Sequence, residues 1–379
     1  MIADEQLLRP QAQRSRPDED KFLVASQWQL IRWKFMRHRV AVLSLIVLII
    51  FYGMAIFAEF FAPYAADAYD VDYVLAPPQR IHFFDNGQWQ GRPFVYGLTA
   101  ELDPNTFRTT YEVDQSQKYP IHLFVQGEPY KLFGLFAGDR RLFGVQEGKI
   151  FLFGADDRGR DVLSRIIYGS RISLSIGLVG IAISSVIGIV IGGISGYVGG
   201  ITDIIIQRVI EFIRSIPTLP LWMALSVALP PTWTVVQVYF GIVLILSLVG
   251  WTGLARVVRG KFLSLREEDF VMAAQLNGAT ERIVIFKHLL PLFYSHLIAS
   301  LTLSVPGMIL GETALSFIGL GLQPPAVSWG VLLKDSQRIR VLAEAPWLLI
   351  PAIFVVVAIL CFNFVGDGLR DAADPYATV

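Results

Sequence analysis

The chain has little cysteine and little charge. Its single cysteine, Cys361, lies in an apolar run, so its 379 residues hold neither a disulfide framework nor a cysteine pair for a metal. Only 17% of the residues are charged, and Lys plus Arg equals Asp plus Glu at 32 each, so no net field favours a nucleic-acid partner. With 54% hydrophobic residues, the chain is too apolar for a soluble protein of this length, and we expect it to reside in a lipid bilayer.

Residues that catalysis or energy coupling would require are also missing. The segment Arg259-Gly260-Lys261-Phe262 has no Ser or Thr after its lysine and no glycine at position 255, so there is no phosphate-binding loop. The apolar runs at 40–61, 292–310 and 347–365 carry no ionisable group in their central turns, which argues against an ion-coupled secondary transporter. Five histidines show no metal-ligand spacing with Cys, Asp or Glu: His38, His82, His122, His288 and His296. We therefore expect no enzymatic chemistry, metal or cofactor in this chain.

Long apolar runs predict membrane-spanning helices. Five are long enough to cross a hydrocarbon core of about 30 Å, at 40–61, 172–194, 236–255, 292–310 and 347–365. A sixth candidate, 204–229, is weaker because Arg208, Glu211 and Arg214 interrupt its start, and because Pro217 would kink it.

Basic residues orient these spans. Arg37 and Arg39 flank the first span and predict a cytoplasmic N-terminus. A second basic cluster follows the 236–255 span: Arg256, Arg259, Lys261, Arg266, Arg282 and Lys287. Both clusters lie on the cytoplasmic side only if 204–229 also crosses, so we expect six spans with both termini in the cytoplasm.

The segments around the first span differ in character. Residues 1 to about 20 are polar, and residues 22–36 mix aromatic and basic side chains, which predicts a helix on the membrane surface. Residues 62–155 are rich in aromatic residues, glycine and turn signals, which predicts an external β-rich subdomain. Hairpin turns are expected at Asn86-Gly87, in the QGEP stretch 126–129 and in the QEG stretch 146–148.

The most informative segment outside the spans is SLREEDFVMAAQLNGATERIVIFKHLLP, at 264–291. Ser264 starts a Ser-x-x-Glu capping pattern, and an Asn-Gly pair ending at Gly278 supplies a left-handed helix stop. The adjacent Ala273 and Ala274 let the backbone approach another surface closely, which suits a helix that enters a groove on a partner protein. An ordinary surface hairpin is the alternative.

These motifs resemble a known family. Ala273-Ala274, then Gly278, then Leu290-Pro291 resemble the EAA loop of ABC importer permeases. Four further stretches resemble the C-type subunit of oligopeptide and dipeptide importers: GADDRGRDVLSRIIYGSRISLSIG (154–177), GYVGGITD (196–203), GETALSFIGLGLQPPAVSWG (311–330) and FNFVGDGLRDAADP (362–375). The resemblance covers about 30–65 and 154–375.

The resemblance implies a fold and an assembly. The fold is an all-α polytopic membrane protein with about six transmembrane helices and a β-rich external insert. It implies half of a pore for peptides or peptide-like solutes, working by alternating access in a bacterial inner membrane. The implied partners are a homologous second permease, two ATPase subunits that bind ATP and Mg, and an external solute-binding protein. Oligosaccharides, opines and nickel chelates are alternative cargoes.

The expected organisation follows from the spans and the resemblance. It comprises a tail with an interfacial helix (1–39), a first span (40–61), the external insert (62–155), a permease core (156–366) with a coupling loop (256–291), and a C-terminal tail (367–379). By resemblance, the coupling loop docks on the ATPases through Glu267, Glu268, Met272, Ala273, Ala274, Gly278, Leu290 and Pro291. Met272 replaces the glutamate that names the loop, so the salt bridge of that glutamate is not expected.

A second candidate set lies on the external side. Five charged residues precede the second span and could meet the charged ends of a peptide or the rim of a binding protein: Asp156, Asp157, Arg158, Arg160 and Asp161. They could equally pair with one another, since carboxylates favour the start of a helix. Glu312 follows an apolar stretch at its external end and could either face the pore or cap a turn.

Overall fold

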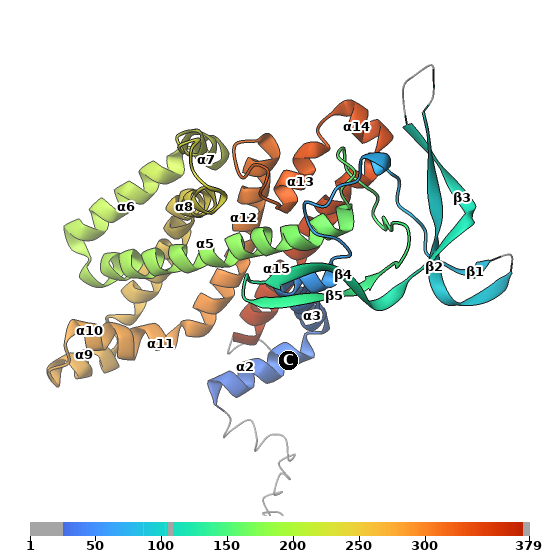
Figure 1. Ribbon diagram of the computed structural model, residues 1–379. Helices are drawn as coiled ribbons and strands as arrows, with labels where there is room; N and C mark the ends of the chain where they lie inside the picture. Colours follow the sequence, from blue (N-terminus) through green and yellow to red (C-terminus); the bar gives the residue numbers. More distant parts are fainter. Residues whose placement is uncertain (1–25, 86, 103, 105–108, 374–379) are drawn as a thin grey trace, which may run out of the picture.

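The computed structural model describes residues 26–85, 87–102, 104 and 109–373, and shows a helical bundle with a β-rich lobe (Figure 1). The helices are α2 (Gln27–Arg37), α3 (Arg39–Ile56), α4 (Ala58–Phe61), α5 (Val162–Val198), α6 (Gly200–Ser215), α7 (Thr218–Val227), α8 (Val235–Leu265), α9 (Asp269–Leu276), α10 (Glu281–Ile283), α11 (Leu290–Leu292), α12 (Tyr294–Ile318), α13 (Trp329–Asp335), α14 (Ile339–Glu344) and α15 (Ile350–Ala373). Short turns of other helix types occur at Val71–Tyr73, Val284–Leu289 and Pro346–Leu349. The strands are β1 (His82–Asp85), β2 (Gln88–Leu102), β3 (Thr109–Pro120), β4 (His122–Leu132) and β5 (Phe136–Gly144).

Five helices in the described part of the chain are long and apolar enough to cross a membrane: α3, α5, α8, α12 and α15 with the turn before it. They confirm the predicted polytopic helical fold. The sixth candidate is not one kinked helix, because α6 ends at Ser215 and α7 begins at Thr218. Pro217 lacks the N–H that would continue the helix, and it also disfavours helical backbone in the residue before it. The six-span topology and its orientation stay predictions.

The longest helix, α5, is the centre of the bundle. It packs along α8, α12 and α3. Gly188, Gly192 and Gly196 recur every four residues on the side that meets α8. A Cβ on Gly192 would overlap the carbonyl oxygen of Ala255, and one on Gly196 would come within 2.7 Å of the Arg259 carbonyl oxygen. Small residues at this spacing let two membrane helices approach at backbone distance.

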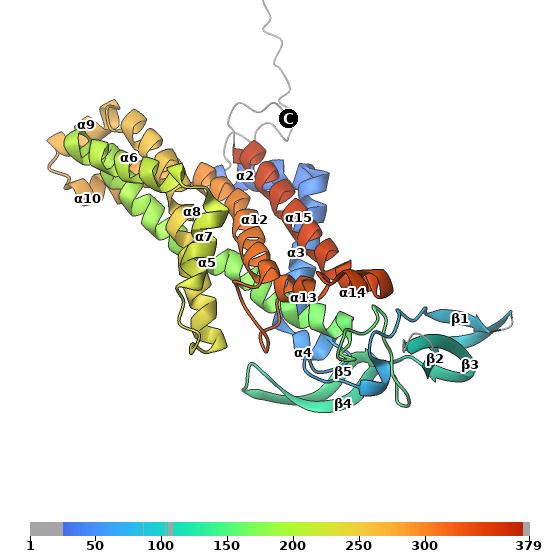
Figure 2. The same ribbon diagram turned by 90° about the horizontal axis from the view of Figure 1, so that it is seen from above.

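The β lobe, which consists of β1 to β5, forms two antiparallel sheets. One has the order β1-β2-β3 and the other is the β4–β5 hairpin. Figure 2 shows the β lobe at one end of the bundle and α2, α9 and α10 at the opposite end. The predicted β-rich insert is therefore present, and it lies far from the basic segment that follows α8.

The first expected hairpin turn is confirmed by the strand pairing. Asp85 at the end of β1 pairs with Gln88 at the start of β2, so two residues connect the strands. Gly87 has φ +80°, the left-handed conformation that such a turn requires. Asn86 lies outside the described residues.

The other two expected turns are wrong. Residues 126–129 lie inside β4, and the β4–β5 turn comes later, at Phe133-Gly134. Gly127 serves close packing instead, since a Cβ there would lie 2.7 Å from the Nε of Arg141 on β5. Residues 146–148 form a bend after β5, and no strand follows it before α5.

The predicted helix near the N-terminus is present as α2, while residues 22–25 lie outside the described part. Ser26 caps it and forms a reciprocal capping box with Gln29. Ile31 and Phe35 are buried, and the helix packs against α15. Its location on a membrane surface stays a prediction.

The contact between α5 and α8 yields a matched test. Gly192→Ala should destabilise the protein by about 1–3 kcal/mol, because the new methyl group meets rigid backbone. Gly260→Ala, in α8, is the control, because a Cβ there meets nothing within 4 Å, and it should be neutral or stabilising by up to about 1 kcal/mol. Unfolding by SDS, followed by circular dichroism in detergent, measures both. Equal stability of the two variants would contradict the close approach.

Candidate functional site

A tight loop precedes α5 on the side of the β lobe. Asp156 organises it, because its Oδ1 accepts hydrogen bonds from the backbone N–H of Arg158 at 2.9 Å and of Arg160 at 3.0 Å. Gly159 has φ +74°, and a Cβ on it would overlap the carbonyl oxygen of Asp70. Asp70 in turn donates its N–H to the Gly159 carbonyl at 3.2 Å. The sequence thus folds 154–161 into a fixed turn against the start of the insert.

Asp156 is also the centre of a buried ion-pair cluster. Its Oδ2 accepts from Arg160 Nε at 2.8 Å and from the buried guanidinium of Arg165 in α5. The same guanidinium lies 3.6 Å from Asp335 Oδ2 at the end of α13. The carboxylates of Asp156, Asp157 and Asp335 lie close together, and the two arginines offset two of the three negative charges. The cluster ties the loop, α5 and α13, and breaking such a buried pair typically costs about 3–5 kcal/mol.

Asp161 is the N-cap of α5. Its Oδ2 accepts from the Ser164 backbone N–H at 2.7 Å, while its buried Oδ1 has no hydrogen-bond partner among the described groups. Burial raises the pKa of the Asp161 carboxyl to about 7. The carboxylate therefore serves the helix start rather than an external ligand.

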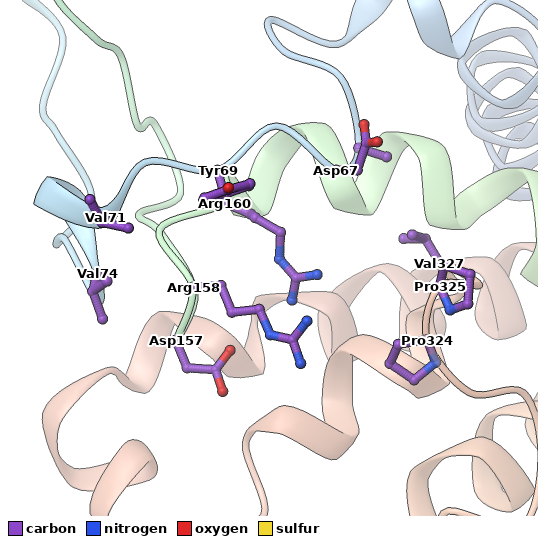
Figure 3. Close-up of a pocket in the computed structure, with 11 residues that line it drawn as sticks. Asp67, Tyr69, Val71, Val74, Asp157, Arg158, Arg160, Pro324, Pro325 and Val327 are labelled. Carbon is purple, nitrogen blue, oxygen red and sulfur yellow. The ribbon is translucent and has the colours of Figure 1, made fainter.

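The residues that remain accessible line an external pocket (Figure 3). The cavity measures about 910 Å³ and is lined by Ala66, Asp67, Tyr69, Val71, Val74, Asp157, Arg158, Arg160, Pro324, Pro325 and Val327. Figure 3 shows the guanidinium groups of Arg158 and Arg160 directed into the space between Asp157 and the two prolines. Arg158 is exposed and makes no ion pair with a described residue, whereas Asp157 lies 3.7 Å from Arg338. The pocket thus presents one guanidinium that forms no ion pair with a described carboxylate.

Glu312 is not placed as expected. It lies inside α12, fully buried, and neither follows the helix nor caps a turn. Its carboxylate accepts from the hydroxyls of Ser328 at 2.7 Å, Ser316 at 2.8 Å and Ser173 at 3.3 Å. Each of these hydroxyls also accepts a backbone N–H, from Val331, Leu322 and Trp329 respectively. The three hydroxyls are thereby aligned as donors toward Glu312, which joins α12, α5 and the segment before α13.

The coupling loop begins differently from the prediction. Ser264 lies inside α8, which continues to Leu265, so the expected capping box is wrong. Glu268 occupies the N-cap of α9 without a side-chain capping bond. The predicted stop is correct, because Gly278 has φ +80° and Ala279 donates its N–H to the Ala274 carbonyl at 3.0 Å.

Helix α9 has one anchored face and one open face. Val271 is fully buried in a cluster with Val258, Phe262 and Val284. Among the predicted residues, Glu267, Glu268, Met272, Ala273 and Gly278 are exposed, Ala274 and Pro291 are half-buried, and Leu290 is buried. Leu276, at 90% exposure, is the most exposed apolar side chain of the loop, and Phe286 is 61% exposed. An exposed apolar face on a fixed short helix is the geometry of a docking element.

Polar contacts connect this loop to the far end of α5. Gln275 Nε2 lies 3.3 Å from the Tyr197 hydroxyl oxygen, and Arg266 donates to the Gly196 carbonyl at 3.4 Å. About two turns further into α8, Arg259 forms a bidentate pair with Asp203 of α6, at 2.5 Å through each oxygen. The coupling loop and the external pocket therefore lie at opposite ends of one helix (Figure 2).

The candidate residues predicted from sequence included Arg158 but omitted Leu276. That Arg158 makes no ion pair with a described residue appears only in three dimensions. Leu276 gave a usable signal, since it is an apolar residue immediately before an Asn-Gly stop. The links from α5 to the loop gave none, because Tyr197 and Gln275 are 78 positions apart.

The buried cap generates a pH prediction. Because the folded pKa of Asp161, about 7, lies above the unfolded value near 3.9, this group stabilises the fold fully below about pH 4, and the contribution is lost as pH rises to 7. Relative to Asp161→Asn, which keeps a cap but does not titrate, wild type should lose about 2–3 kcal/mol of unfolding free energy between pH 5 and pH 7. SDS unfolding at both pH values measures this. Parallel pH curves would contradict it.

Comparison with known proteins identifies the family. The family model described as binding-protein-dependent transport system inner membrane component matches residues 188–378. A second model, the N-terminal TM domain of oligopeptide transport permease C, matches residues 26–78. The oligopeptide transport system permease protein OppC of Haemophilus influenzae is 46% identical over 232 residues, which are 61% of this chain and 72% of that protein.

Other relatives and solved structures extend the comparison. The dipeptide transport system permease protein DppC of Bacillus subtilis is 40% identical over 224 residues, 59% of this chain and 68% of that protein. The inward-facing structure of the MetNI methionine ABC transporter covers 55% of this chain and 97% of its own, with 18% identity and a TM-score of 0.44. On the match over residues 188–378 and the identity to OppC, the chain belongs to the family of binding-protein-dependent transport system inner membrane components.

Proposed function

We propose that the chain forms half of the translocation pore of an ATP-binding cassette importer and moves peptides or peptide-like solutes by alternating access. The relatives named as oligopeptide and dipeptide permeases, at 46% and 40% identity, support the cargo class. The observation that carries the proposal is α9, a short helix with a buried anchor at Val271 and an open apolar face. Such an element suits a groove on another protein.

The assembly in this proposal has four kinds of component. This chain pairs with a homologous permease in a bacterial inner membrane, with both of its termini in the cytoplasm. Two ATPase subunits bind ATP and Mg and dock on the coupling loop, and a periplasmic binding protein delivers the solute. The basic residues near α2 and after α8 support this orientation.

The coupling residues divide into two roles in this proposal. Met272, Ala273 and Gly278 are exposed and provide the contact surface, together with Leu276. Leu290 is buried and, with Pro291 in the first turn of α11, holds the loop in place. Glu267 and Glu268 stand at the exposed entry to α9, where carboxylates favour the helix dipole.

The external pocket is the proposed contact for the binding protein or the arriving peptide. Arg158 offers an uncompensated guanidinium, and Arg160 and Asp157 line the same cavity. Carboxylates bind arginine through paired, charge-assisted hydrogen bonds. Three buried carboxyl groups hold the segments beneath this surface in place: Asp156, Asp161 and Glu312.

The cargo class is tested by transport. The purified complex, reconstituted in proteoliposomes with its binding protein, should take up a radiolabelled tripeptide in the presence of ATP and Mg, and not in the presence of ADP. A maltotriose probe of the runner-up class should not be taken up. ATP-dependent uptake of the sugar without the peptide would overturn the peptide assignment and leave the importer assignment in place.

The docking role of α9 is tested by adding bulk to its exposed face. Ala273→Trp should leave the fold intact, because exposed positions tolerate substitution within about 0.5 kcal/mol. It should weaken association with the ATPase subunits about tenfold, equivalent to about 1.4 kcal/mol, because the ring blocks close backbone approach. Microscale thermophoresis with the purified ATPase measures the affinity.

Arg32→Trp is the matched control, since Arg32 is also exposed but lies on α2, outside the coupling loop. It should bind the ATPase as wild type does and show the same stimulated ATP hydrolysis. Full association and full stimulated hydrolysis by Ala273→Trp would show that α9 is not the docking element.

A further inference from the structure

The end of the β4–β5 hairpin exposes a group of large apolar side chains. The hairpin tip, which we define as Phe133, Leu135 and Phe136, is 56%, 79% and 68% exposed, respectively. Contiguous exposed apolar side chains on a lobe outside the bundle indicate a contact with another apolar phase. No described residue of the chain covers them fully.

The backbone of the hairpin tip adopts a left-handed conformation that a phenylalanine rarely takes. Phe133 and Gly134 have φ +51° and +72°, and Leu135 donates its N–H to the Leu132 carbonyl at 3.0 Å. Turns of this kind normally use Asn or Gly at the first position, because a residue with a Cβ is disfavoured in the left-handed conformation. A phenylalanine in this position is a cost to the fold that an interaction of its ring can offset.

The depth of the hairpin tip is fixed by Arg171 of α5. The Phe133 ring lies against the Arg171 guanidinium, 5.4 Å from its carbon to the ring centroid. The same guanidinium donates to the carbonyls of Ala55 at 2.9 Å and Ile56 at 3.2 Å, and to Glu59 at 2.9 and 2.7 Å. Ile56 is the last residue of the membrane-spanning α3. The hairpin tip is therefore held at the level where this span leaves the hydrocarbon.

The surface of α3 continues toward this level as an apolar stripe. Its exposed residues recur at helical spacing along one side: Val40, Leu43, Ile46, Ile50 and Phe57. At the base of the hairpin, Phe124 packs against Phe60 of α4, with 6.2 Å between ring centroids. Figure 2 shows the β4–β5 hairpin beside α4 at the end of the bundle, and α4 contacts both strands. Exposed Lys131, two residues before Phe133, can reach a lipid phosphate.

We propose that the hairpin tip inserts into the interfacial layer of the outer leaflet and anchors the β lobe to the membrane. Aromatic side chains concentrate at this layer, where apolar rings meet the acyl chains and polar neighbours meet the headgroups. Contact with lipid removes the exposed rings from water, and the contact with Arg171 sets how deep the hairpin tip enters the membrane. The inference requires the membrane orientation described above and is independent of the cargo.

Accessibility of spin labels in membranes tests the anchor. In a Cys361→Ala background, nitroxide labels are placed singly at Leu135→Cys and Phe136→Cys, with Gln88→Cys at the exposed β1–β2 turn as the control. The full transporter is measured in native membranes with oxygen, which partitions into lipid, and a nickel chelate, which stays in water. The ratio of oxygen to nickel collision rates should be at least about fivefold higher at 135 and 136 than at 88, since hydrocarbon excludes the chelate.

Two results would overturn the anchor. Ratios at 135 and 136 that equal the ratio at 88 would place the hairpin tip in water. Labels that neither reagent reaches would show that another protein chain covers it. A charge substitution provides a second test in which the substituted residue carries no label. With the label at 135, Phe136→Asp should lower the ratio of oxygen to nickel collision rates, whereas the matched Phe83→Asp on β1 should leave it unchanged.

Discussion

The close approach of α5 to α8 is the constraint on which the rest of the structure depends. Between helices in lipid there is no hydrophobic driving force, so association relies on packing and hydrogen bonds. Gly188, Gly192 and Gly196 remove the side chains that would keep the two backbones apart. The helix is 37 residues long, or about 55 Å at the usual rise, so one packed element reaches from the external pocket to the coupling loop.

Polar groups fasten both ends of this element to their neighbours. At the end near the β lobe, Arg165 joins α5 to Asp156 and to Asp335, and the Ser173 hydroxyl joins it to Glu312 of α12. At the other end, hydrogen bonds from Gln275 and Arg266 attach the coupling loop. Both ends of α5 are therefore joined to neighbouring segments by direct hydrogen bonds and ion pairs.

The sequence predicted those features that depend on one segment alone. Apolar runs located the five long helices, because length and hydropathy suffice to define a span. The Asn-Gly stop at Gly278 was correct because positive φ is a local property. The capping box at Ser264 failed because the apolar packing of α8 extends its helix past that position, and tertiary packing outweighs a cap that contributes about 1 kcal/mol.

Features that depend on distant segments could not be predicted in the same way. The glycine at 127 signals a turn by composition, yet it is required by the Arg141 side chain on the neighbouring strand. Glu312 gave the signal of a pore-facing charge, but its serine partners come from 139 positions before and 16 positions after it. Pairings of that kind are set by the fold, and a single sequence carries no local trace of them.

Hydrogen bonds join the start of the insert to the loop that lines the pocket. Leu75 donates its N–H to the Asp156 carbonyl at 3.0 Å, and Ala155 donates to the Ala76 carbonyl at 2.8 Å. The start of the insert is therefore hydrogen-bonded to the loop before α5. Trp347, in the turn before α15, adds a bond from its indole N–H to the Ala155 carbonyl at 2.9 Å. The pocket walls include residues from both of these segments, so the bonds between the segments also fix the shape of the pocket.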